Sequence, residues 1–152
     1  MPTKNEDRKV ILLTVDGIVV TTSENQLPKV ILIRRRYPPF VDHLAIPGGF
    51  VKYGETTEHA VIREVEEEIG IKILETDLTL LGVYSKPERD PRGHNVTVAY
   101  FYRTSQTLSP KKGDEATAIE FIPFIEDVIQ QEKLAFDHKE ILLDAIMRFG
   151  VN

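Results

Sequence analysis

Hydrophobic residues along the chain gather in short runs that polar segments separate. Residues 10–20 (VILLTVDGIVV) and 29–36 (KVILIRRR) are rich in Val, Ile and Leu, a composition typical of β-strands. The polar segment 21–27 between them and the following Pro28 predict a turn, so we expect these two strands to be neighbours. Similar runs predict further strands over residues 71–73, 78–84, 96–103 and 118–122.

A helical spacing marks residues 56–69. The apolar residues of this segment recur every three or four positions, at Val61, Ile62, Val65 and Ile69. Thr56 can cap the first turn, because its side-chain oxygen can accept a backbone N–H, and Gly70 is typical of a helix end. Two shorter helices are predicted around residues 125–130 and 139–149.

The composition is that of a folded protein. The chain has 152 residues, 41% of them hydrophobic and 28% charged, and it has no cysteine. At this length one domain over residues 1–152 is the expectation, and the lack of cysteine excludes disulfide scaffolds, thiolate zinc sites and thiol nucleophiles. The 19 basic and 24 acidic side chains give a net charge of −5. This balance argues against a nucleic-acid partner, because such binding needs a basic surface.

The chain contains no apolar run near the ~20 residues that a membrane-spanning helix needs, so no membrane partner is expected. Residues 1–9 (MPTKNEDRK) mix both charges without an apolar segment. We interpret them as a flexible N-terminus rather than as a secretory signal. The expected location is therefore cytoplasmic.

Three carboxylates stand close together on the predicted helix. Glu64, Glu67 and Glu68 are spaced i, i+3 and i+4, so they share one helix face. At ~5–6 Å each pair repels by about 3 kcal/mol if the effective dielectric constant is ~20. We therefore expect a cation among them: Mg²⁺ first, then Mn²⁺ or Ca²⁺, which prefer oxygen ligands. Arg63 can offset part of the charge and orient Glu67.

Glutamates on a helix are usually a solvated face, but the residues upstream change that interpretation. Five residues separate Gly49 from Glu55, and seven separate Glu55 from Arg63. The whole string resembles the Nudix box, G-x5-E-x7-R-E-U-x-E-E-x-G-U with U aliphatic, and every specified position is filled. The chain thus resembles the Nudix hydrolase family.

The resemblance implies an α/β fold: an α/β/α sandwich around a mixed β-sheet, with the catalytic box forming a strand, a loop and a helix. It also implies hydrolysis of a nucleoside diphosphate linked to another moiety, with Mg²⁺ or Mn²⁺ as cofactor. Such an ion neutralises phosphate oxygens and activates water.

The same resemblance assigns roles within the box. Glu64 and Glu68 are expected to bind the metal, and Glu67 to bind it or to orient the attacking water. The Gly48 carbonyl, in the turn that Pro47-Gly48-Gly49 predicts, can complete the ligand set, and Glu55 is a more distant or additional ligand. Gly49 lets the backbone approach the substrate closely.

An all-glutamate box leaves the general base open. Nudix enzymes often use a glutamate from a loop outside the box, so Glu115 is the first candidate, Glu88 the second and Glu67 the third. Arg63 completes the candidate catalytic set. His94 and His138 are expected to make hydrogen bonds or to cap a helix rather than to catalyse.

The loop over residues 85–94 carries the substrate prediction. By itself a loop rich in Pro, Gly and Asp is typical of turns, but together with the box, S-x-P-x-R-D-P-R-G-H resembles the ADP-ribose pyrophosphatase branch of the family. Arginine forks on a proline-stiffened loop suit phosphate or ribose hydroxyls. Arg89 and Arg92 are therefore the expected substrate contacts.

Two further groups are weaker candidates. Arg34, Arg35 and Arg36 alternate faces of a strand, so not all three can face the site; Arg36 and Arg34 are retained as candidates. Tyr37 and Phe40 can stack on a base or pack in the core, and Phe40 is carried as a candidate contact.

The predicted reaction is hydrolysis of ADP-ribose to AMP and ribose 5-phosphate by a homodimer, the dimer being implied by the family alone. One alternative is an ADP-ribose-sensing module, because residues 134–138 (LAFDH) resemble a segment of Nudix-type transcriptional regulators. Another is a Nudix hydrolase that acts on nucleoside triphosphates or dinucleoside polyphosphates.

Overall fold

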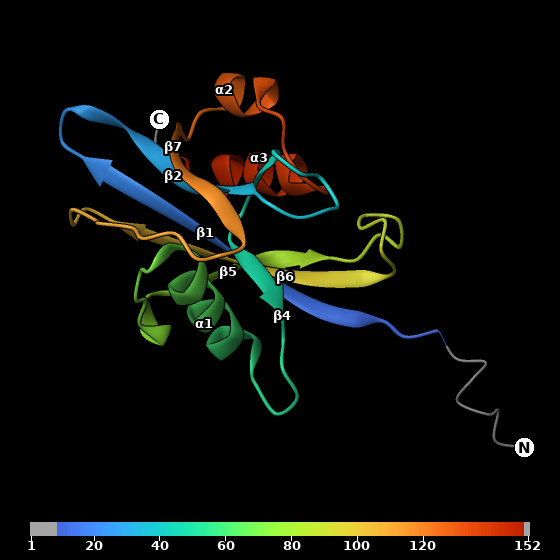
Figure 1. The fold of residues 1–152 in the computed structure, drawn as a ribbon. Helices are drawn as coiled ribbons and strands as arrows, with labels where there is room; N and C mark the ends of the chain where they lie inside the picture. The colour runs from blue at the N-terminus through green and yellow to red at the C-terminus, as the bar shows by residue number, and fades with distance from the viewer. Residues whose placement is uncertain (1–8, 151–152) are drawn as a thin grey trace, which may run out of the picture.

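The computed structural model describes residues 9–150, and within them a β-sheet lies between helices (Figure 1). Its strands are β1 (Leu12–Ser23), β2 (Gln26–Arg35), β3 (Leu44–Ala45), β4 (Gly48–Phe50), β5 (Thr79–Tyr84), β6 (Asn95–Thr104) and β7 (Ala116–Pro123). Its helices are α1 (Thr57–Ile69), the short 3₁₀-helix η2 (Glu75–Asp77), α2 (Glu126–Gln131) and α3 (His138–Phe149).

The sheet is mixed. Its main path runs β3-β2-β1-β6-β5, while β4 pairs with β1 and β7 pairs with β2. β1 and β6 are parallel, and the other strand pairs are antiparallel. β1 is long enough to meet β4 near its start and β2 near its end.

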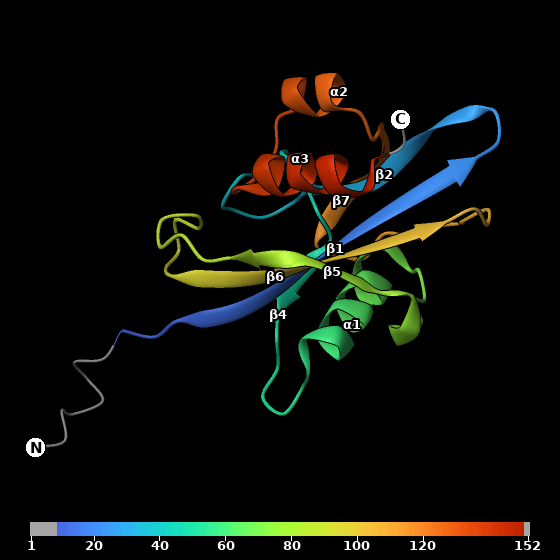
Figure 2. The same ribbon diagram turned by 180° about the vertical axis from the view of Figure 1, so that it is seen from behind.

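The two faces of the sheet have different helices. Figures 1 and 2 show α1 on one face and α2 and α3 on the other. Alternate residues of β2 follow this division: Ile31 and Ile33 pack with α1, whereas Val30 and Leu32 pack with α2 and α3. This alternation is the ordinary period of a strand. The α/β/α sandwich around a mixed sheet is thus confirmed.

Most predicted elements lie within a few residues of the observed ones. The predicted helix 56–69 corresponds to α1, where the Thr56 hydroxyl accepts the His59 N–H at 3.1 Å and Gly70 ends the helix with φ of 69°. Both helix signals are therefore confirmed, because each residue supplies a hydrogen bond or backbone angle that the helix end needs.

Two local predictions need correction. The strand predicted over residues 71–73 is wrong: Ile71 and Ile73 are buried in the core beside α1, but the segment is irregular and leads into η2. β3 and β4 occupy a stretch interpreted as a loop and a turn, since two- and three-residue strands are too short to show a period. Of the predicted flexible N-terminus, residues 1–8 lie outside the described part of the chain.

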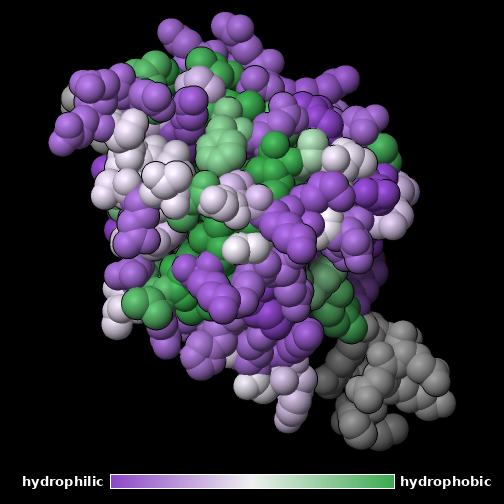
Figure 3. Space-filling model, turned by 60° about the vertical axis from the view of Figure 1, so that its left-hand side comes forward, coloured by the Kyte–Doolittle hydropathy of each residue, from purple (hydrophilic) through white to green (hydrophobic). Residues whose placement is uncertain are grey.

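The visible surface is mostly polar. On the face shown in Figure 3, hydrophobic side chains form narrow strips between hydrophilic ones. None of the helices in residues 9–150 has the length and hydropathy required to cross a membrane.

Gly17 sets how closely α1 approaches β1. A Cβ atom at this position would lie 2.5 Å from Cγ2 of Val65, so Gly17→Ala should overpack the interface and lower the free energy of unfolding by about 1–3 kcal/mol. Gly82→Ala in β5 is the matched control, because its Cβ would meet nothing nearer than 3.9 Å. Denaturant unfolding of both variants checks this. Equal losses in the two variants would contradict it.

Candidate active site

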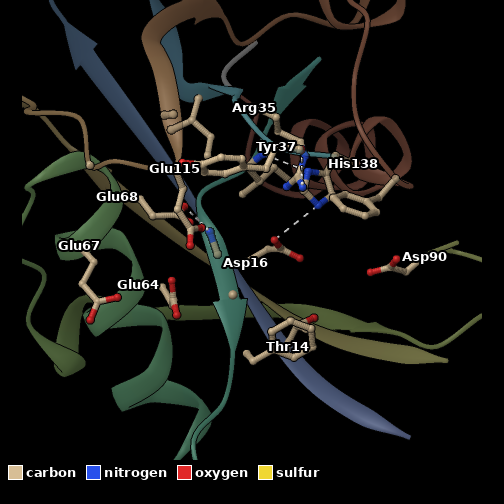
Figure 4. A pocket seen from close by; sticks show the side chains of 18 of the residues that line it. Thr14, Asp16, Arg35, Tyr37, Glu64, Glu67, Glu68, Asp90, Glu115 and His138 are labelled. Atoms are coloured by element: carbon tan, nitrogen blue, oxygen red, sulfur yellow. Dashed lines mark hydrogen bonds and ion pairs between the residues drawn. The ribbon is translucent and has the colours of Figure 1, made fainter. Parts of the chain in front are cut away.

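A cavity of about 680 Å³ opens where β1, β2 and β4 meet α1, the 85–94 loop and the start of α3. Figure 4 shows Arg35 and Tyr37 at one end of it and Glu64 and Glu67 at the other. The volume lies within the range of small-molecule sites in proteins. The cavity therefore combines acidic and basic groups at the scale of a nucleotide.

The glycine turn and α1 are joined by carboxylates. Glu68, only 7% exposed, accepts the Gly48 N–H through Oε2 at 2.9 Å. Glu64 packs its carboxylate against Gly49, where a Cβ would lie 2.6 Å from the Glu64 Oε1. Any side chain at position 49 would displace that carboxylate, which explains the requirement for glycine.

Burial makes both carboxylates unusually basic. It raises the pKa of Glu68 well above its ordinary value, against the opposing Gly48 hydrogen bond, and the nearby charges of Glu64, Glu115 and Asp16 raise it further. Burial also raises the pKa of Glu64, although Arg63 opposes the shift. These two carboxylates therefore need more positive charge nearby than Arg63 alone provides.

Arg63 organises the loop between β4 and α1. Its guanidinium donates to both oxygens of Glu55, at 2.7 and 2.9 Å, and to the Phe50 carbonyl at 3.1 Å. It also donates to Glu64 at 2.8 Å and to Glu67 at 3.3 Å. Its hydrogen bonds hold the pKa of Glu55 at about 2. Glu55 faces Arg63 and does not line the cavity, whereas Glu67 lines it with a largely exposed side chain.

The donor set fits a hard divalent ion in chemistry. Oxygen atoms alone are offered, and Glu64 and Glu68 have raised pKa values with an incomplete counter-charge. As placed, no three His, Cys, Asp or Glu side chains of residues 9–150 stand close enough to enclose an ion.

Glu115 reaches the cavity from a separate segment. The chain before β7 is held against the end of α1, where the Lys111 N–H donates to Ile69 O at 2.9 Å and the Gly113 N–H to Glu68 O at 3.0 Å. These bonds satisfy carbonyls that a helix end leaves free. Glu115 lines the cavity as a result, whereas Glu88 does not.

The basic end of the cavity is built on Phe136. The guanidinium carbons of Arg35 and Arg92 lie 5.0 and 5.5 Å from the centre of its ring, within the range of cation–π contacts. Burial and the charge of Arg92 lower the pKa of Arg35. Because these two positive charges lie close together, an anion in the cavity would be favoured beside them. Arg35 also donates to the Pro39 and Tyr37 carbonyls.

The neighbouring arginines lie elsewhere. Arg34 donates to Glu120 at 2.6 Å, and Arg36 donates to the Ala116 carbonyl at 3.2 Å; neither lines the cavity. Phe40 also lies outside the lining and stacks edge-on against Phe136, with ring centres 5.0 Å apart.

Arg89 lines the cavity but is strongly engaged. It donates to both carboxylate oxygens of Asp137, at 2.9 and 2.6 Å, and is 9% exposed. Burial alone would lower the pKa of Arg89, but these bonds raise it. Its bidentate pair fixes the 85–94 loop against the start of α3.

Several lining residues escaped the sequence-based selection of sites, among them Arg35, Asp16 and His138. Asp16 is the single charged residue in the run 10–20, and that interruption of an apolar strand was an available signal. Arg35 follows Ile33 on the same face of the strand. Which face borders the cavity depends on tertiary packing and could not be predicted from the sequence. His138 was expected to be a hydrogen-bonding group, and it is one.

The three-layer α/β/α fold and the acidic strand–loop–helix beside this cavity are the features that the Nudix-box resemblance predicts. A model of the NUDIX domain family matches residues 12–145. The chain belongs to this family.

Among its relatives, the ADP-ribose pyrophosphatase of Methanocaldococcus jannaschii is 42% identical over 132 residues, covering 87% of this chain and 71% of that protein. The family match and this identity support a Nudix pyrophosphohydrolase.

Solved structures agree on the fold. A MutT/nudix family protein from Enterococcus faecalis has a TM-score of 0.85 at 32% identity, covering 96% of this chain and 64% of that one. The NUDIX domain of Shewanella oneidensis NrtR, crystallised with ADP-ribose, has a TM-score of 0.82 at 30% identity, covering 96% and 93%.

Asp90 should make the 85–94 loop sensitive to acid. Burial raises the pKa of Asp90, but hydrogen bonds from Arg92 and Asn95 outweigh this effect and hold it at about 2. A lowered pKa stabilises the fold above the unfolded value near 4, so about 2 kcal/mol should be lost as the pH falls from about 4 to 2. The free energy of unfolding measured against pH should fall less steeply in Asp90→Asn. Identical slopes would contradict the assignment.

Proposed function

We propose that the protein hydrolyses the diphosphate bond of ADP-ribose, giving AMP and ribose 5-phosphate, with Mg²⁺ as its cofactor and Mn²⁺ as a possible substitute. The observation that carries this proposal is the cavity itself, in which buried carboxylates and the guanidinium groups of Arg35, Arg89 and Arg92 line one space of about 680 Å³. A diphosphate needs positive charge on its oxygens and a base for the attacking water.

Within this proposal the box residues hold the ion. Glu64 and Glu68 are the ligands, with Glu67 and the Gly48 carbonyl as further oxygen donors and Glu55 kept at a distance by Arg63. The bound ion would neutralise phosphate oxygens and activate water. Arg63 is then a positioning residue, because its contacts are with carboxylates rather than with the cavity.

Glu115 is the favoured general base. It comes from outside the box, lines the cavity, and lies near enough to Glu64 and Glu68 to raise the pKa of both. Glu67 is the alternative, since it also lines the cavity; Glu88 is the least favoured because it does not.

At the basic end, Arg35 and Arg92 bind phosphate in this proposal, and Tyr37 borders the same region. Arg89 supports the loop through Asp137 and reaches substrate only by partly leaving that pair. Gly49 keeps the backbone open to the substrate. The surroundings of Arg34, Arg36 and Phe40 favour structural roles for them.

The experiment is product analysis by mass spectrometry, with Mg²⁺ and a panel of ADP-ribose, NADH, diadenosine polyphosphates and nucleoside triphosphates. AMP and ribose 5-phosphate should appear first. Glu68→Gln should lower kcat by at least about 100-fold, because it removes a metal ligand itself rather than a residue that hydrogen-bonds to one. The fold should stay intact because glutamine still accepts the Gly48 N–H. Glu66→Gln, half-exposed on the same helix, is the matched control.

Three outcomes would count against the proposal. Preferential cleavage of a triphosphate or a dinucleoside polyphosphate would replace the substrate. ADP-ribose that raises Tm without turnover would indicate a binding module, an alternative that the ADP-ribose complex of the NrtR domain favours. Wild-type turnover by Glu68→Gln would refute the metal site. The homodimer and the cytoplasmic location stay predictions.

Arg35 supplies a second test. Arg35→Met should raise KM for ADP-ribose by about 10- to 100-fold, the effect of losing a charged hydrogen bond of ~1.5–3 kcal/mol. Arg34→Met is its matched control, because Arg34 pairs with Glu120 outside the cavity, and its KM should stay unchanged. Steady-state kinetics compares the two. Equal KM values in the two variants would contradict a role of Arg35 in substrate binding.

A further inference from the structure

A chain of buried polar groups crosses the wall of the cavity and has no part in the reaction as proposed. It joins Thr97 of β6, Asp16 of β1, His138 of α3 and the backbone of Ile46, which precedes β4. Thr97, Asp16 and His138 are 0%, 6% and 3% exposed, respectively. Burying polar groups is costly unless they are paired, so their arrangement needs a reason.

The contacts determine which nitrogen of His138 carries hydrogen. The Ile46 N–H donates to Nδ1 at 3.0 Å, so Nδ1 must offer its lone pair. Nε2 then carries the hydrogen and faces Oδ1 of Asp16 at 3.5 Å, as the dashed line in Figure 4 marks. The other Asp16 oxygen accepts from the Thr97 hydroxyl at 2.6 Å. Burial lowers the pKa of His138, in keeping with a neutral ring.

These contacts lie next to the glycine turn. Besides the pairing of β4 with β1, three hydrogen bonds hold the backbone of the turn. The Ile46 N–H donates to His138 Nδ1, the Pro47 carbonyl accepts the Gly17 N–H at 2.8 Å, and the Gly48 N–H donates to Glu68. The last two come from β1 and α1. Only the first comes from the layer on the other face of the sheet.

Asp16 borders the turn from its other side. Its Oδ1 lies 2.6 Å from where a Cβ of Gly48 would be, and Figure 4 shows Asp16 and Glu68 on either side of β4. One imidazole ring therefore contacts both the residue that precedes the turn and the carboxylate packed against it.

We propose that His138 is a positioning residue for the catalytic turn, acting through Nδ1 on Ile46 and thereby on Gly48 and Glu68. The effect on turnover rests on the proposed hydrolysis. Displacing reacting groups by about 1 Å can cost about 100-fold in rate, so a free Ile46 N–H should lower kcat and leave KM nearly unchanged.

Two amide variants separate the two ring nitrogens. His138→Asn places an acceptor near the Nδ1 position and should keep kcat within about 3-fold of wild type, while His138→Gln reaches the Nε2 position, leaves Ile46 unpaired and should lower kcat by about 10- to 100-fold. KM for ADP-ribose should change by less than about 3-fold in both. Calorimetry gives Tm of each variant, so that loss of fold is recognised separately.

Equal kcat in the two amide variants would overturn the proposal, since a merely structural histidine has no reason to distinguish them. A fall in kcat that follows Tm across both variants would overturn it as well.

Hydrogen exchange of the Ile46 amide tests the anchor without any substrate. Exchange should be about 10-fold faster in His138→Gln than in wild type, as expected for one lost hydrogen bond, and near wild type in His138→Asn. Unchanged exchange in His138→Gln would overturn the anchor even in an active enzyme. If wild-type protein fails to cleave ADP-ribose, the proposed function fails while this exchange pattern still decides the role of His138.

Discussion

Glu68 is 7% exposed and its carboxylate accepts the Gly48 N–H at 2.9 Å, so the end of α1 and the start of β4 meet through a group that is costly to bury. A carboxylate in such a place is stabilised only by donors and by positive charge. Neighbouring Glu64, Glu115 and Asp16 add negative charge instead. This end of the cavity therefore favours a cation close to Glu68.

The fold brings both layers of helices to this cavity. α1 supplies the acidic residues from one face of the sheet. On the other face, α3 supplies His138, and Phe136 lies just before the start of α3. Arg35 and Arg92 both lie near the ring of Phe136, so two positive groups are held together at this end of the cavity. This separation of charge within one cavity suits a substrate that carries several phosphate oxygens.

Two arginine–carboxylate pairs hold the loops around the site. Arg63 holds the β4–α1 loop through Glu55, and Arg89 holds the 85–94 loop through Asp137. Bidentate pairs of this kind restrict geometry as well as adding energy. The turn at Gly48 receives comparable support from three separate elements.

The sequence by itself determined the elements with a clear period and the residues joined by short spacing. α1, its caps at Thr56 and Gly70, and the shared face of Glu64, Glu67 and Glu68 could be predicted because helix geometry relates residues only a few positions apart. The box from Gly49 to Ile71 was recognised by its resemblance to a family motif. The sequence did not determine the short strands β3 and β4, nor the irregular course of Ile71 to Ile73, because burial there comes from distant partners. The tertiary structure alone decided that Arg35 rather than Arg34 borders the cavity, and that Asp16 meets His138, 122 positions further along the chain. A strand's pattern shows that its two faces differ, but only packing against the other layers decides which face reaches the site.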